Sequence, residues 1–252
     1  MLQVARLAPN LLQDAAEPLA EFFLSQFNED GGAANRAGQS DLYYTVFALE
    51  GLIALQVEFP TKVSHFLETF GDGDKLDLVH LCCLARCWAN LKGDAPRLDR
   101  RIEALWDRES VYHSFLAWGA LQDQGKRPRP LEVRDSSPVR TTPTTAAAMT
   151  LQRQMHQTVP SEIVQWLLAR AHPEGGFFAT EGAPMPDLLS TATALHALSG
   201  QQVSFAHLKE PTLDFLDTLW TGRAFCGNWA DDEPDCEYTY YALLAMGHLS
   251  LA

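Results

Sequence analysis

The sequence predicts an all-α protein, an (α/α)6 toroid whose six helical hairpins form one domain over residues 1–252. Two observations carry this prediction. First, a glycine-containing turn followed by an acidic residue and an apolar helix occurs three times, at 30–52, 174–198 and 227–247. Second, the helices expected in these repeats are apolar on nearly every face, and such helices must lie inside a larger assembly. Internal repeats of this length decide the architecture.

The first three hairpins each pair an amphipathic outer helix with an apolar inner helix. Asn10 is placed to cap the first outer helix, whose single apolar stripe is typical of a half-exposed position. The inner helices are expected to begin near positions 41, 77 and 109. The outer helices expected in this part of the chain are 11–27, 61–70 and 98–106.

The last three hairpins are less uniform. The prolines within 125–140 exclude a continuous helix, so the fourth hairpin is expected to be irregular and to lack a regular outer helix. Inner helices should begin near positions 141, 187 and 235, and we find no segment with the alternating pattern of a strand. Six inner helices would then surround an axis, with the outer helices around them. The outer helices expected here are 161–171 and 205–220.

Charge and cysteine content narrow the class of protein. The formal net charge of -13 disfavours nucleic acid and anionic membrane surfaces as partners. The 5 cysteines are odd in number and clustered, which indicates reduced thiols rather than a disulfide framework. We find neither a signal-peptide pattern nor an apolar run long enough to span a membrane. We therefore expect a soluble, cytoplasmic protein without membrane insertion.

The repeat signature resembles a known superfamily. In register, Tyr44-Thr45, Ser190-Thr191 and Tyr238-Thr239 coincide, each after an acidic residue and a glycine turn. This pattern is similar to the prenyltransferase and squalene-cyclase repeat, and most similar to the β subunit of protein farnesyl- and geranylgeranyltransferases. The resemblance implies an aromatic-lined central cavity for an isoprenoid or other apolar ligand. It also implies a protein partner, since the family's β subunit binds a helical α subunit; a homo-oligomer is the alternative.

The family's zinc and diphosphate sites are not matched residue by residue. In register, its zinc-binding Asp is Asp187, but its Cys falls on Leu189 and its His on Tyr238. A catalytic zinc needs three deprotonatable ligands, and leucine supplies none. The basic residues that hold the diphosphate in the family fall on Glu181 and Pro184. We therefore expect no zinc at the family position, and no cofactor follows from the resemblance.

Acidic residues stand where the inner helices are expected to begin. Each fits the role of an N-cap, because a carboxylate accepts the free N–H groups of the first turn. Together they would ring one mouth of the toroid. These residues are Asp41, Asp77, Glu109, Asp187 and Asp235. Three positions further on, side chains are expected to point toward the axis: Tyr44, His80, Tyr112, Ser190 and Tyr238.

These positions and nearby aromatic residues give the candidate site. The candidate catalytic residues are Asp187, Asp235, Glu237 and Tyr238. The candidate ligand-binding residues are Tyr44, Phe47, His80, Tyr112, Ser190, Trp229 and Tyr241. No residue is assigned to a metal.

Three functions remain open at this stage. The first is a prenyltransferase-like protein, a transferase acting on isoprenoid substrates if it is active. The second is a non-catalytic toroid that serves as a scaffold for a partner. The third is a magnesium-dependent, terpene-cyclase-like enzyme, since the acids from Asp231 to Asp235 fit an Asp-Asp-x-x-Asp pattern. Pro234 interrupts that pattern, and magnesium would need further phosphate ligands.

Overall fold

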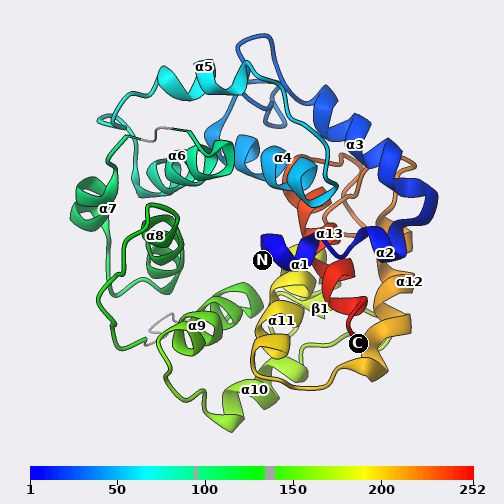
Figure 1. Ribbon diagram of the computed structural model, residues 1–252. Helices are drawn as coiled ribbons and strands as arrows, with labels where there is room; N and C mark the ends of the chain where they lie inside the picture. The colour runs from blue at the N-terminus through cyan, green and yellow to red at the C-terminus, as the bar shows by residue number, and fades with distance from the viewer. Residues whose placement is uncertain (94–95, 134–139) are drawn as a thin grey trace.

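The computed structural model describes residues 1–93, 96–133 and 140–252, and its helices form a closed ring (Figure 1). The result confirms the expected all-α toroid. In the described residues the inner helices are α4 (Leu42–Ala54), α6 (Leu78–Leu91), α8 (Val111–Asp123), α9 (Thr142–Gln154), α11 (Leu188–Gly200) and α13 (Cys236–Leu249). The outer helices are α3 (Ala16–Ser25), α5 (Val63–Glu68), α7 (Asp99–Leu105), α10 (Ser161–Leu168) and α12 (Lys209–Leu219).

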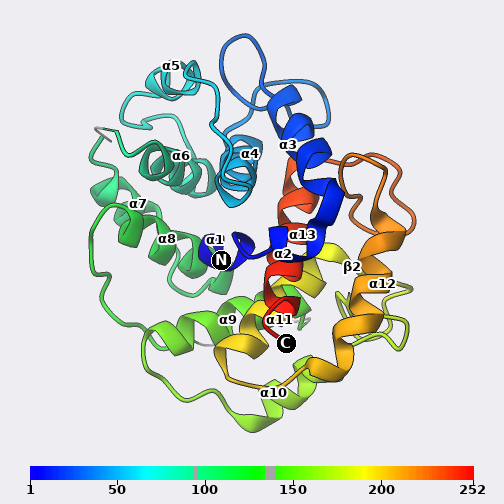
Figure 2. The same cartoon turned by 45° about the vertical axis from the view of Figure 1, so that its right-hand side comes forward.

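Each inner helix packs against the next one, and α13 packs on α4 to close the ring. Figure 2 shows α3 and α12 on the outer side of α4 and α13. The junction between α8 and α9 is less extensive than the other inner junctions. The part of the connecting segment that the structure describes contains no outer helix, as expected for the fourth hairpin, while 134–139 lie outside the described residues.

The inner helices begin at polar N-caps. The side chains of Asp41, Asp77, Asp187 and Asp235 each accept a hydrogen bond from a backbone N–H of the first turn. Ser110 and Thr141 cap the other two in the same way. Glu109 was expected as the cap of α8, and this was wrong: the helix begins one residue later, where the Ser110 hydroxyl accepts from the His113 N–H.

Two local differences from the expected elements have clear causes. The first outer helix is not continuous over 11–27, because Gln13 has a φ of 47° and separates α2 (Pro9–Leu12) from the rest. The η1 turn (Gln13–Ala15) leads from there into α3. A short antiparallel pair, β1 (Phe177–Phe178) with β2 (Pro186–Asp187), closes the loop before α11, although no strand was expected.

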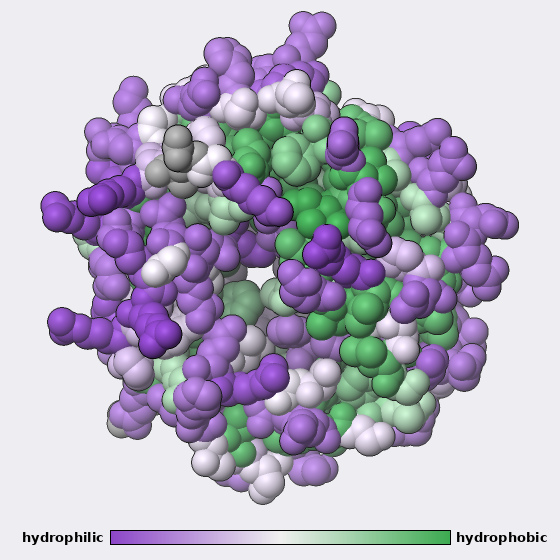
Figure 3. All heavy atoms as spheres, viewed as in Figure 1, coloured by the Kyte–Doolittle hydropathy of each residue, from purple (hydrophilic) through white to green (hydrophobic). Residues whose placement is uncertain are grey.

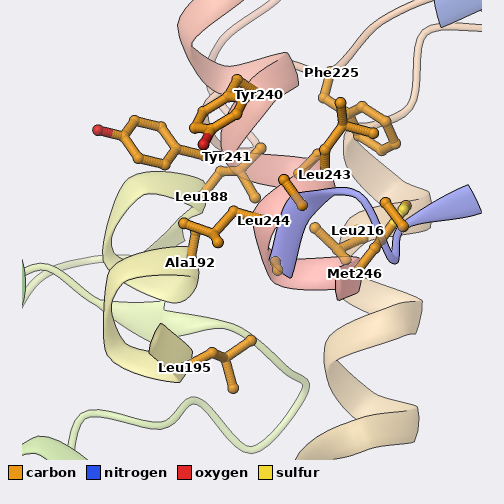
Figure 4. Packing of buried hydrophobic residues seen from close by; sticks show 14 of the residues in the cluster. Leu188, Ala192, Leu195, Leu216, Phe225, Tyr240, Tyr241, Leu243, Leu244 and Met246 are labelled. Carbon is orange, nitrogen blue, oxygen red and sulfur yellow. The ribbon is translucent and has the colours of Figure 1, made fainter. Parts of the chain in front are cut away.

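Buried leucine and alanine side chains hold the ring together. Figure 4 shows Leu188 and Ala192 of α11 beside Leu244 of α13, and all three are 0% exposed. The face of α13 that carries Gly247 receives the short helix α1 (Leu2–Ala5). A Cβ at Gly247 would lie 2.1 Å from the Val4 carbonyl oxygen, so this close approach depends on glycine. No helix among the described residues is both long and apolar enough to cross a membrane.

Candidate functional site: the axial cavity

The ring encloses an axial cavity with two different halves. The half near the first turns of the inner helices has a volume of about 130 Å³ and is largely apolar; we call it the apolar chamber. Its lining includes Tyr43, Tyr112, Phe115, Ala147, Leu189, Glu237 and Tyr241. A smaller space of about 80 Å³ continues it toward Phe47, Cys82 and Cys83. We call the nearby end of the ring, where the inner helices begin, the Asp mouth.

Glu237 and Tyr43 form a hydrogen-bonded pair in the apolar chamber. The Tyr43 hydroxyl donates to Glu237 Oε1 at 2.6 Å. Burial raises the pKa of the Glu237 carboxyl, and the hydrogen bond from Tyr43 partly opposes this shift. Burial, with the neighbouring Tyr241 and Glu237, also raises the pKa of Tyr43. The pair therefore presents to an apolar space a carboxyl group that retains its proton more readily than an exposed one.

In five of the six inner helices the residue two positions after the N-cap lines the chamber, and in α9 Thr144, at the third position, lines it as well. Tyr44, Ser190 and Tyr238 were expected to face the axis, but the lining of the chamber does not include them, and each follows a lining residue by one position. The Ser190 hydroxyl instead donates to Asp187 at 2.7 Å, and the residue is fully buried. One residue turns a side chain by about 100° around a helix, which is enough to move it out of the lining. The lining residues at the second position are Tyr43, Tyr112, Pro143, Leu189 and Glu237.

Tyr112 lines the chamber as expected, although for a different reason. It was placed by counting three residues from Glu109, and the structure places it two residues after the true cap, Ser110. Phe47 and Tyr241 also line the cavity, with ring centroids 5.5 Å apart. Burial raises the pKa of Tyr112 to about 12.

His80 lies outside the residues that line the chamber. Its Nδ1 is 2.8 Å from Asp77 Oδ1, and its Nε2 is 4.0 Å from Asp41 Oδ2. These contacts tie the imidazole to the caps of α6 and α4. His80 was expected to face the axis, and the structure corrects this, because the two carboxylates hold the ring among the helix starts.

Trp229 lies away from the axial cavity, and its placement there was wrong. It is 43% exposed and belongs to a groove beside α12, together with Pro211 and Phe215. The indole N–H donates to the Thr218 hydroxyl at 2.8 Å. The loop before α13 therefore turns this aromatic residue outward onto an outer helix instead of inward.

Asp187 and Asp235 act as helix caps with unequal surroundings. Burial raises the pKa of both carboxyl groups. Asp235 is also bound by Arg36, whose Nε donates to its Oδ2 at 2.8 Å. The same guanidinium donates to both carboxylate oxygens of Asp231, and this hydrogen bonding lowers the pKa of Asp231. Sequence reasoning missed Arg36, because no local pattern relates it to acids near the other end of the chain.

The other half of the axial cavity is polar. It has a volume of about 330 Å³ and lies where the inner helices end; we call it the polar chamber. Its lining includes an ionic cluster in which Arg86 pairs with Glu50 and lies 3.8 Å from Asp123. Figure 3 views the ring from the side of Figure 1, and the face is hollowed near its centre. Sequence reasoning did not identify this chamber or its three charged residues.

The family of this chain follows from a comparison of its sequence with models of known protein families. A model described as the prenyltransferase alpha-alpha toroid domain matches residues 8–89 and 128–251, which is more than half of the chain. The chain belongs to the prenyltransferase alpha-alpha toroid family. The search of curated proteins gave no match.

The residues of this toroid do not fit the zinc ion that the β-subunit resemblance implies. Leu189 has no donor atom, and the Tyr238 ring lies beside Gly227 and Arg36. Among the described residues no group of three or more His, Cys, Asp or Glu side chains is placed to hold a metal. No step of the chemistry below is therefore assigned to zinc, and its absence stays a prediction.

Proposed function

We propose that this toroid binds an isoprenoid or other apolar chain in the axial cavity, as a prenyltransferase-like protein, with the Tyr43–Glu237 pair facing one end of the ligand. The observation that carries the proposal is the apolar chamber itself. Tyrosine, phenylalanine and alanine side chains from α4, α8, α9 and α13 surround it. Among the described residues that line it, Glu237 is the one with a carboxyl group. Such a concave apolar site with few convergent polar groups is typical of ligand-binding pockets.

The hydrophobic effect supplies enough free energy for this binding. Each CH₂ group that moves from water into the chamber contributes about 0.8 kcal/mol. Lost translational freedom and the ordering of side chains offset much of this gain. A fifteen-carbon chain gains about 12 kcal/mol in this way, so a cost of about 4 kcal/mol leaves about -8 kcal/mol, which corresponds to micromolar affinity.

The chemistry available at the site is proton exchange. The raised pKa of Glu237 favours its protonated form, and Tyr43 fixes the orientation of the carboxyl group through the 2.6 Å hydrogen bond. A protonated carboxyl in an apolar chamber can donate its proton to a bound ligand, and its conjugate base can take one back. Catalysis by this toroid would therefore be acid–base chemistry on an apolar substrate.

A diphosphate group is not needed for the binding we propose. Glu181 occupies one of the positions at which the β-subunit resemblance implies a basic residue, and it lies 3.7 Å from Arg170. The acids of the magnesium pattern are partly neutralised, because Arg36 pairs with both Asp231 and Asp235. These contacts favour apolar binding over a metal-dependent diphosphate site.

Calorimetric titration with farnesol and farnesyl diphosphate tests the proposal. In metal-free buffer we expect both ligands to bind with micromolar affinity and within about threefold of each other, since burial of the chain dominates. Added magnesium should change the affinity of neither ligand. A diphosphate that binds far more tightly than the alcohol only with magnesium would favour the terpene-cyclase-like alternative.

A cavity-filling variant locates the site. Ala147 lines the apolar chamber on α9, so Ala147→Leu should weaken farnesol binding at least tenfold. Ala104→Leu in the exposed part of α7 makes the same chemical change away from the cavity and should leave binding unchanged. If neither ligand binds the parent protein at its solubility limit, the proposal fails and a scaffold role is favoured. Binding that survives Ala147→Leu would contradict the assigned location.

A further inference from the structure

Polar side chains lie at the inner end of the apolar chamber. His196 and Thr193 of α11 and Thr150 of α9 all belong to its lining. About two helical turns, or about 10 Å, separate His196 from Leu189, the lining residue of α11 near the Asp mouth. His196 and Thr150 also line the polar chamber, so they stand at the boundary of the two spaces. The apolar chamber therefore has a second polar region, at the end opposite the Tyr43–Glu237 pair.

The ring of His196 is held in one orientation by His248. Its Nδ1 lies 3.0 Å from His248 Nε2, between the packed helices α11 and α13. Burial lowers the pKa of His196 to about 3 and that of His248 to about 4, so both rings are neutral at pH 7. Because the two nitrogens of an imidazole point in nearly opposite directions, Nε2 of His196 is directed away from α13. This nitrogen has no hydrogen-bond partner among the described residues.

The contact between the two histidines decides which nitrogen of His196 carries the proton. One of the two neutral rings must donate to the other. Nδ1 of His248 is buried and has no hydrogen-bond partner in the part of the chain that the structure describes. Because a buried N–H group without an acceptor is rarer than a buried acceptor without a donor, the proton of His248 belongs on Nε2. His196 then accepts at Nδ1 and carries its own proton on Nε2, where it is a free hydrogen-bond donor.

The two threonines supply acceptors beside this donor. Thr193 Oγ1 donates to the Leu189 carbonyl at 2.7 Å, and Thr150 Oγ1 donates to the Ala146 carbonyl at 2.8 Å. Each hydroxyl thereby uses its single proton, and its oxygen keeps lone pairs that can accept. Thr193 and His196 share a face of α11 because they stand at i and i+3, and α9, which carries Thr150, packs against α11. One donor and two acceptors thus line one end of a largely apolar space.

A hydroxyl group fits this set of partners. It accepts one hydrogen bond, which the Nε2–H group of His196 can donate, and it donates one, which a threonine oxygen can accept. A carbonyl group would leave the threonine oxygens unused, and an ammonium group would leave the Nε2–H group without an acceptor. A carboxylate cannot donate to the threonines, and its charge would lose its hydration in an apolar space.

We propose that His196, Thr193 and Thr150 bind a hydroxyl group, so that the ligand of this toroid is an apolar chain with a hydroxyl group at its inner end. The other end of the chain faces the Tyr43–Glu237 pair. This inference rests on the function proposed above, and it adds a second polar group to the same ligand. The two polar ends of the ligand are then separated by about the axial depth of the chamber, about 10 Å.

Matched alcohols and diols test the inference in calorimetric titrations of the full chain at pH 7. The pairs are 1-hexanol with 1,6-hexanediol, 1-octanol with 1,8-octanediol, and 1-decanol with 1,10-decanediol. A second hydroxyl group that is buried without partners would weaken binding by about tenfold or more. We expect one of the three diols to bind within about threefold of its alcohol, because at that length each hydroxyl group reaches its own partners.

Substitutions in the lining locate the subsite. His196→Leu should lower the affinity of the best diol relative to its alcohol at least tenfold, because the second hydroxyl group loses its donor. Thr193→Val replaces a lining hydroxyl with a methyl group and should lower the same ratio at least threefold. Thr69→Val is the matched control: this threonine is exposed after α5, and its hydroxyl also donates to a carbonyl, that of Phe66 at 2.6 Å. It should leave the ratio unchanged.

The tautomer of His196 provides a measurement that needs no substitution, and it remains available if His196→Leu fails to fold. Long-range proton–nitrogen NMR spectra of the histidine rings distinguish a proton on Nε2 from one on Nδ1. We expect the proton of His196 on Nε2, and we expect the best diol to shift this nitrogen signal more than its alcohol does. A proton on Nδ1 of His196 would overturn the assignment of this residue as the donor.

The outcomes distinguish the two proposals. If 1-octanol and farnesol both fail to bind, the apolar-ligand function itself is wrong. If the alcohols bind but every diol binds at least tenfold more weakly, the hydroxyl subsite is wrong and the apolar-ligand function stands. The same conclusion holds if the relative affinity of the best diol survives both His196→Leu and Thr193→Val.

Discussion

Arg36 Nε donates to Asp235 Oδ2 at 2.8 Å, a hydrogen bond that joins the first hairpin to the last. The guanidinium also holds Asp231 through two hydrogen bonds of 3.1 and 2.7 Å. Asp235 is largely buried, while the Arg36 side chain is partly exposed. This contact complements the packing of α13 on α4 and fixes the loop at the point where the ring closes.

We expect Arg36→Ala to lower the free energy of unfolding by about 1–2 kcal/mol, because it leaves the buried carboxylate of Asp235 without its cation. Urea denaturation at pH 7 measures the change. Arg100→Ala, which removes an exposed arginine from α7, should change the free energy of unfolding by less than about 0.5 kcal/mol. Equal effects of the two substitutions would contradict a role of Arg36 in closing the ring.

Gly247→Ala should detach α1 from α13. The new Cβ would lie 2.1 Å from the Val4 carbonyl oxygen, and backbone at that distance has to move. We expect a loss of about 2 kcal/mol or more in stability, together with faster amide hydrogen exchange in α1. Gly119→Ala is the control, since nothing lies within 4 Å of its added Cβ and α8 should gain up to about 1 kcal/mol. A Gly247→Ala protein with an unchanged α1 would show that the close approach is wrong.

The buried Glu237 should make stability depend on pH. Burial raises the pKa of Glu237 in the folded state. Its favourable contribution to the free energy of unfolding is therefore complete below the unfolded pKa of about 4.3, and it is lost as the pH rises through the folded pKa. Glu237→Gln removes this dependence, so the variant should gain stability relative to the parent between pH 4 and pH 7. Urea unfolding at both pH values measures it. If Glu237→Gln gains no stability relative to the parent over this range, the pKa of Glu237 is not raised in the folded protein.

Tyr43→Phe provides an independent measurement on the same pair. The Tyr43 hydrogen bond lowers the pKa of Glu237, so its loss should raise that pKa further. Carbon-13 NMR titration of the Glu237 carboxyl group would report the shift. A pKa that stays constant or falls in the variant would mean that the 2.6 Å hydrogen bond does not form in solution.

His196 and His248 should make the protein sensitive to acid. His196 Nδ1 lies 3.0 Å from His248 Nε2, and burial lowers the pKa values of the two residues to about 3 and about 4. The two neutral imidazoles contribute to the free energy of unfolding, and this contribution is fully present above the unfolded pKa of about 6.5. It is lost as the pH falls toward the two lowered pKa values, by up to about 1.4 kcal/mol per pH unit for each proton.

His248→Gln should therefore flatten the pH dependence of stability between pH 6.5 and pH 4. His65 is a suitable control, because its imidazole is exposed on α5, and His65→Gln should leave the slope unchanged. Equilibrium unfolding in urea at four pH values gives the slope. A parent protein whose stability stays constant over this range would contradict the burial of two neutral imidazoles.

The repeat and the caps could be recognised in the sequence because both are local. A glycine turn, an Asp and an apolar run define where an inner helix begins, and Asp41, Asp187 and Asp235 cap their helices as expected. The irregular fourth hairpin follows in the same way from its prolines, which exclude a helix for steric reasons.

The sequence alone determined the all-α toroid, its inner helices and the caps Asp41, Asp77, Asp187 and Asp235, because hydrophobic periodicity and capping act over a few neighbouring residues. Tertiary structure alone decided which side chains meet. Glu237 faces the chamber rather than Tyr238 because a shift of one residue rotates a side chain by about 100°. Glu50, Arg86 and Asp123 form one cluster because three inner helices end beside one another around a common axis. Arg36 reaches Asp235 because the ring closes. The two residues lie far apart in the sequence, so no local sequence pattern relates them.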